Sequence, residues 1–244
     1  MMRVVFTMRF TALRMIRNYI TLLLLLVVPI IILTIFHFIL SGAVTDTGEP
    51  YINETALTMV MTFQLFGGSL VMYLIHNDLF AANRMRMNAL PFNQTMYAFS
   101  IMLCGTVFSI MLGVLLMAFS QFILGVVWKN WLWTIYLIFL MSLLSSVVCL
   151  LFTLSVKSYK LAERLSEIYG VGFVVLAGLF FPMPQNAFFE FMGSYGNPLA
   201  LSIGAIVEMN RANAGEAWLH ANMLGAATVV LFLVMLAVGR RRMA

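Results

Sequence analysis

The chain has 244 residues, of which 63% are hydrophobic and only 9% are charged. In a soluble domain about a quarter of the residues are charged. The 14 Lys and Arg and 9 Asp and Glu of this chain cannot cover the surface of a soluble protein of this length. We infer that much of the surface faces lipid. The composition therefore excludes a secreted disulfide scaffold, a disordered regulator and a nucleic-acid-binding domain, in spite of the net charge of +5.

Residues 1–18 are predicted to form an amphipathic helix that lies in the membrane interface. At about 100° per residue, Arg3, Thr7, Thr11 and Arg14 fall on one side of it, and apolar residues gather opposite. Arginine side chains on such a helix meet anionic lipid headgroups. The alternative is an ordinary basic flank of the first span. A cleaved signal peptide is disfavoured because the apolar run that follows is longer than the roughly 7 to 15 residues of such a peptide.

Stretches without Asp, Glu, Lys or Arg predict an all-α integral membrane protein with six transmembrane helices, since a span needs about 20 apolar residues. The spans are expected near residues 19–40, 55–75, 95–127, 131–156, 167–182 and 217–238. Between the third and the fourth, Lys129 is flanked by Trp128 and Trp131, which indicates a tight turn at the membrane interface. We expect the whole chain, residues 1–244, to form a single transmembrane domain.

The distribution of charge along the chain predicts its orientation. With the N-terminus in the cytoplasm, twelve of the fourteen cations lie on the inner side, and Lys129 and Arg211 lie outside. Six of the nine acidic residues lie outside. Because Lys and Arg in short loops set the orientation, both termini are expected in the cytoplasm.

Residues 76–94 form the largest cytoplasmic feature that we expect between two spans. Its polar and turn-forming residues are Asp78, Asn83, Arg84, Arg86, Asn88, Leu90 and Pro91. Since Pro91 is well placed to end a short helix, we expect a polar helix parallel to the membrane that presents these side chains to a cytosolic partner. The alternative is a connector whose two arginines only fix the topology.

The region between the fifth and sixth spans does not fit simple span counting. About 15 apolar residues of the fifth span end at Pro182 and Pro184, and the resulting ~22 Å of helix is shorter than a ~30 Å hydrocarbon core. A second interruption is expected at Asn197 and Pro198. We expect residues 183–215 to form an extracellular re-entrant hairpin of two short helices, because irregular backbone at membrane depth must pack on protein or line water. A seventh short span is the alternative, but it would place the cationic C-terminus outside.

No catalytic constellation is visible in the sequence. The three histidines are far apart, at His37, His76 and His220, so no metal site is expected. A G-x-x-x-x-G-K-[ST] loop is absent, so any ATP would be hydrolysed by another subunit. The lack of a carboxylate in the middle of a span counts against ion-coupled transport. Three polar residues inside spans are candidates for a transport pathway: Gln64, Gln121 and Asn222.

Taken together, the amphipathic helix, the six spans, the polar segment and the broken fifth span resemble the permease subunit of ABC-2 type ABC exporters. The local matches are Leu90-Pro91 followed by Tyr97, the run from Gly178 to Pro182, and Asn197-Pro198-Leu199. The family usually carries an acidic Glu-Arg-Glu run before the Leu-Pro pair. Here Ala82-Asn83-Arg84 stands in its place, which removes the basis for a specific salt bridge to the ATPase at that position.

The resemblance implies that residues 78–91 are a coupling helix that docks in a cleft of a separate ATP-binding subunit, with Arg84, Arg86 and Asn88 as contacts. It implies two permeases, identical or homologous, and two ATP-binding subunits that carry ATP and Mg. The permease itself would have no cofactor and would not be an enzyme.

The expected function is outward transport of an amphipathic or lipophilic cargo across a bacterial cell membrane. A peptide antibiotic, a lipopeptide or a drug would be such a cargo, which links the chain to antibiotic resistance. The alternatives are polysaccharide or lipid export by the same family, and a non-transporting membrane scaffold or receptor. The lack of convergent acids or metal ligands disfavours a membrane enzyme.

Overall fold

The computed structural model describes residues 2–45, 48, 50–81, 83–85, 89, 94–178 and 184–243. Apart from one isolated bridge between Val44 and Pro50, the regular structure in this part of the chain is helical. In chain order the helices are α1 (Met2–Arg17), α2 (Tyr19–Ile39), α3 (Tyr51–Gln64), α4 (Ser69–Ile75), the π-helix η1 (His76–Phe80), α6 (Gln94–Leu124), α7 (Trp131–Ser155), α8 (Tyr159–Leu176), α9 (Ala187–Ser194), α10 (Pro198–Asn210) and α11 (Ala214–Met243).

Within the described residues, five helical segments are long and apolar enough to cross a membrane. They are Tyr19–Ile39, Tyr51–Phe80, Gln94–Leu124, Trp131–Ser155 and Ala214–Arg241. Each coincides with a charge-poor run of the sequence, so five of the six expected spans have a matching helix. The chain is a multi-pass, all-helical membrane protein.

The expected fifth span, near residues 167–182, has no such match. Helix α8 begins earlier, at Tyr159, and its first half carries Lys160, Glu163, Arg164 and Glu167. Only its second half is continuously apolar, and residues 179–183 lie outside the described part of the chain. A sixth span therefore stays a prediction.

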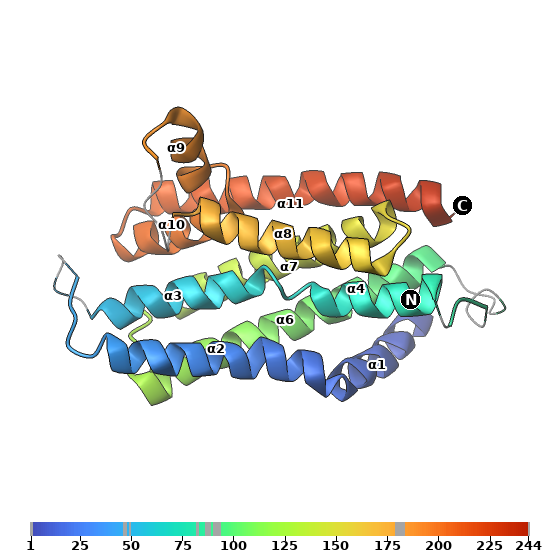
Figure 1. The fold of residues 1–244 in the computed structure, drawn as a ribbon, viewed down its shortest axis with the longest axis horizontal. Helices are drawn as coiled ribbons and strands as arrows, with labels where there is room; N and C mark the ends of the chain where they lie inside the picture. The colour runs from blue at the N-terminus through green and yellow to red at the C-terminus, as the bar shows by residue number, and fades with distance from the viewer. Residues whose placement is uncertain are drawn as a thin grey trace.

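The helices lie side by side and form an elongated bundle (Figure 1). Both chain termini lie at one end, together with the end of α4 and the start of α6; we call this the terminal end. Helices α9 and α10 and the start of α3 lie at the opposite end. Helix α1 meets α2 at an angle at Asn18, so the two helices are separate elements, as expected for an interfacial helix that precedes a span.

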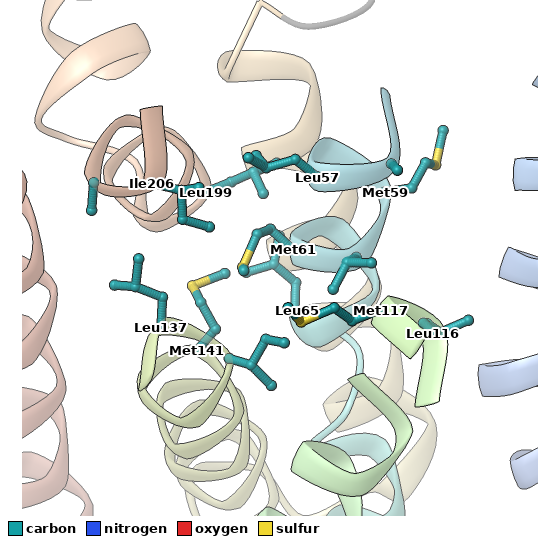
Figure 2. Close-up of a cluster of buried hydrophobic side chains, with 14 of the residues drawn as sticks. Leu57, Met59, Met61, Leu65, Leu116, Met117, Leu137, Met141, Leu199 and Ile206 are labelled. Carbon is teal, nitrogen blue, oxygen red and sulfur yellow. The ribbon is translucent and has the colours of Figure 1, made fainter. Parts of the chain in front are cut away.

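The core of the bundle lies where α3, α6, α7 and α10 meet. Met61 of α3, Met117 of α6 and Met141 of α7 are fully buried there, and Leu199 and Ile206 of α10 close the cluster on one side (Figure 2). Methionine is flexible enough to fill irregular gaps between helices. The peripheral helices contribute much less, since only 17% of the α2 span and 22% of the α11 span is buried, against 67% of the α7 span. Much of α2 and α11 is therefore left to face lipid or a partner.

The second span is interrupted between α3 and α4, which sequence reasoning did not foresee. The interruption covers residues 65–68, and Ser145 of α7 bridges it. The Ser145 hydroxyl donates to the carbonyl of Leu65 (2.6 Å) and accepts from the backbone N–H of Gly68 (2.9 Å). Gly68 also packs directly on the Ser145 carbonyl, so no Cβ fits there. Backbone groups freed by a break at membrane depth need such protein partners.

Candidate functional site: an ion-pair network beside the connector

The connector, residues 81–93, joins η1 to α6 at the terminal end and contains most of the expected coupling residues. Its described residues include Arg84 and Met85, and both are exposed, Met85 to 89%. Four of the predicted coupling residues lie outside the described part of the chain: Arg86, Asn88, Leu90 and Pro91. The described part of the connector thus presents a cation and a large apolar side chain to the surroundings.

Asp78 of η1 precedes this connector in the chain and lies at the centre of an ion-pair network. Both carboxylate oxygens accept from the Arg14 guanidinium, Oδ2 from Nη1 at 2.7 Å and Oδ1 from Nη2 at 2.9 Å. The Tyr97 hydroxyl donates to Oδ2 at 2.7 Å, and Asn83 Nδ2 donates to Oδ1 at 2.9 Å. The network joins α1, the end of the second span, the first residues of the connector and the start of α6.

The network explains how the charged Asp78 carboxylate can be almost completely removed from solvent. The Asp78 side chain is 1% exposed, whereas the Arg14 side chain is 40% exposed. A buried charge is costly unless its partners are close and well oriented, and the two parallel hydrogen bonds of a guanidinium supply that geometry. The hydrogen bond to Asp78 raises the pKa of Arg14 above its already high usual value, so this partner stays charged.

The burial of Asp78 differs from what was expected of a coupling residue. We expected its side chain on the polar surface of the segment, whereas the structure turns it inward, where it cannot touch another subunit. Asn83 likewise donates to Asp78, and its backbone N–H donates to the carbonyl of Asn77 at 3.1 Å. These two residues hold the start of the connector, and of the described coupling residues only Arg84 is exposed.

Sequence reasoning missed Arg14 as the partner of Asp78. It placed Arg14 on the polar side of the interfacial helix and assigned it to lipid headgroups. One available signal was Asp78 itself, since an acid directly after a long apolar run needs a cation nearby. Tyr97 was noted only as part of a local sequence match, without a role.

The three predicted pathway residues do not converge on one channel. Gln64 is 2% exposed, and its Oε1 accepts from Ser109 at 2.8 Å and from Ser142 at 2.7 Å. Gln121 lies farther along α6, and its Oε1 is buried without a hydrogen-bond partner among the described residues. Asn222, near the start of α11, is exposed. Gln64 therefore ties α3 to α6 and α7 in this structure, and a pathway role for the three residues stays a prediction.

The two helices expected between the fifth and sixth spans are present as α9 and α10. Asn197 is the N-cap of α10: its Oδ1 accepts from the backbone N–H of Leu199 at 2.9 Å, and its Nδ2 donates to the carbonyl of Phe173 on α8 at 2.7 Å. Pro198 follows as the first helical residue, where its missing N–H costs nothing. Pro184 is exposed, and Pro182 lies outside the described residues. The helical break at Asn197 and Pro198 is thus confirmed, and the insertion of the pair into a membrane stays a prediction.

No group of three or more His, Cys, Asp or Glu that could hold a metal ion occurs within the described part of the chain. The described geometry instead defines a helical membrane protein with a buried polar network around Asp78, close in sequence to the exposed Arg84 and Met85. Residues 3–209 match the family model of the ABC-2 type transporter. Because this match covers most of the chain, the chain belongs to the ABC-2 type transporter family, and the resemblance found in the sequence is confirmed.

Searches of curated proteins and of solved structures found no match. Membership of the family makes the chain a transmembrane subunit of an ABC transporter. Such a subunit works with an ATP-binding partner.

Proposed function

We propose that the chain is the permease of an ATP-driven exporter that moves an amphipathic or lipophilic cargo outward across a bacterial cell membrane. Two permeases, identical or homologous, form the pathway, and two separate subunits bind ATP and Mg. The cargo is a peptide antibiotic, a lipopeptide or a drug. The observation that carries this proposal is the anchored connector at the terminal end of the bundle.

The anchoring of the connector supports a role in receiving force. A push on the connector reaches α1 through Arg14, the second span through Asp78, and α6 through Tyr97, because all three side chains share one hydrogen-bonded network. Nucleotide binding on the partner then needs only to favour one of two helix arrangements by a few kcal/mol, roughly the differential affinity that shifts a two-state equilibrium. The exposed Arg84 and the neighbouring Arg86 and Asn88 contact the ATP-binding subunit.

The position of the termini supports the proposed orientation. Both termini, the end of α4 and the start of α6 share one end of the bundle (Figure 1). Residues 1–18, 81–93 and 240–244 carry nine of the fourteen Lys and Arg, which favours the cytoplasm for this end. In this orientation α8 is the fifth of six spans: its charged first half lies at the inner interface, and its apolar second half enters the membrane. Helices α9 and α10 then form the re-entrant hairpin at the outer end.

The composition supports an apolar rather than a sugar cargo. The chain contains 20 Met and 21 Phe, against 8 Tyr and 4 Trp. Methionine-rich surfaces adapt to varied apolar ligands, whereas a sugar pathway is expected to offer more Tyr and Trp.

The contact assignment is tested by reversing the charge of the connector. In proteoliposomes that contain the chain and its ATP-binding subunit, Arg84→Glu combined with Arg86→Glu should abolish ATP-driven cargo transport while the complex still assembles. Lys157→Glu with Lys160→Glu is the matched control: it reverses two charges at the same end, in exposed positions outside the connector. Normal transport by the connector variant in an intact complex would refute the contact assignment. Equal loss of transport in both variants would also refute it, because a general effect of the reversed charge would then explain the result.

A further inference from the structure

A narrow apolar crevice lies between α6, α7 and α11 near the terminal end. Its volume is about 130 Å³. Its apolar walls include Ala98 and Phe99 of α6, Leu150 and Leu154 of α7, and Leu236 of α11, and Arg240 of α11 adds a positive charge. No acidic residue lines it. The crevice therefore has an apolar interior, which we call the slot, and one cation at its wall.

The size of the crevice restricts what can occupy it. An apolar cavity of about 150 Å³ binds a molecule as small as benzene, so a space of this volume admits a short piece of hydrocarbon chain and excludes a bulky cargo. Phe99 is 42% exposed, and only 22% of the α11 span is buried. A hydrocarbon chain in the surrounding bilayer can thus reach the slot from the side.

The positive charge at the crevice restricts which lipid headgroups can bind beside the hydrocarbon chain. Arg240 lies in the last turns of α11 beside Arg241, and both side chains are exposed. A basic pocket between transmembrane helices at the cytoplasmic side attracts the headgroups of acidic lipids. A zwitterionic headgroup would bring its own cation close to these arginines, so it would gain less binding free energy than an acidic headgroup.

We propose that this crevice is a binding site for an acidic phospholipid of the inner leaflet. Arg240 donates to the lipid phosphate, and a segment of one acyl chain lies between α6, α7 and α11. This site does not depend on the proposed transport activity, and it would exist equally in a membrane scaffold.

Native mass spectrometry of the delipidated full chain tests the proposal. We expect phosphatidylglycerol to bind more tightly than phosphatidylcholine with the same acyl chains. Arg240→Gln should weaken phosphatidylglycerol binding about fivefold, the effect of one cation at an anionic membrane surface. Arg241→Gln removes the same charge one residue away, outside the crevice, and should change binding less than about twofold.

A second variant tests the apolar part of the site without changing the charge. Ala98 is 3% exposed, and Ala98→Leu would fill the slot, so bound phosphatidylglycerol should decrease while helix content stays constant by circular dichroism. Equal binding of the two lipids, or equal effects of Arg240→Gln and Arg241→Gln, would overturn the proposal. Dissociation of a permease dimer by Arg240→Gln would also overturn it, because the crevice would then be occupied by a second copy.

Discussion

Replacement of Arg14 by Met removes the principal partner of a buried carboxylate. Asp78 loses two charge-assisted hydrogen bonds of 2.7 and 2.9 Å and keeps those from Tyr97 and Asn83. Methionine preserves most of the apolar stem of the arginine, so the change isolates the guanidinium. We therefore expect Arg14→Met to destabilise the contact between α1 and the second span.

The size of the effect follows from the exposure of the two partners. Breaking a fully buried pair by removing one member costs about 3–5 kcal/mol, and an exposed pair contributes about 0–1 kcal/mol. Since Asp78 is 1% exposed and Arg14 is 40% exposed, we expect a loss of about 2 kcal/mol. For a chain of this length that corresponds to a decrease in Tm of about 4–8 °C.

Thermal unfolding in detergent, followed by circular dichroism, measures this loss. Arg17→Met is the matched control, because Arg17 lies on the same helix and has no ion pair among those described. Arg14→Lys should lose part of the stability, since an ammonium cannot form the two parallel hydrogen bonds. If Arg14→Met and Arg17→Met unfold within about 1 °C of each other, a shift that corresponds to only a few tenths of a kcal/mol, the network does not stabilise the connector as described.

Two further predictions concern the bundle interior and its orientation. Gln64→Leu leaves the Ser109 and Ser142 hydroxyls without their acceptor. It should cost about 1–2 kcal/mol, given roughly 0.6 and at most 1.7 kcal/mol for one hydrogen bond between membrane helices. Gln121→Leu removes an Oε1 that is buried without a partner among the described residues and should not lower the Tm; equal losses in the two variants would contradict this difference. Cysteine placed at Ser194 should react with an impermeant maleimide from outside intact cells, and cysteine at Ser158 only after the inner face is made accessible; the reverse pattern would invert the proposed orientation.

The spans were largely predictable because a long charge-free run has few structural options in lipid. Helix α8 was the exception, because the expected span covered only residues 167–182, whereas the helix begins at Tyr159 and its first half is charged. A charged turn can stay helical when it continues into an apolar segment, so a charge-free run does not mark where the helix begins.

The polar network was not predictable, because its partners are distant in the sequence. Asp78 and Arg14 are separated by 64 residues, and Ser145 bridges the interruption after Leu65 from 80 residues away. Local sequence grouped Asp78 with the exposed residues of the connector, whereas two of the side chains that surround it, Arg14 and Tyr97, come from α1 and α6. Family resemblance marked Tyr97 without indicating that it donates to Asp78.

ATP-dependent cargo uptake into inside-out vesicles tests the proposed export function most directly. Vesicles that contain the chain and its ATP-binding subunit should accumulate a fluorescent amphipathic peptide when ATP and Mg are added. Vesicles that lack either subunit, or that carry an ATP-binding subunit unable to hydrolyse ATP, should not. Uptake that is the same with and without the chain, or that proceeds without ATP hydrolysis, would contradict an ATP-driven export function for this permease.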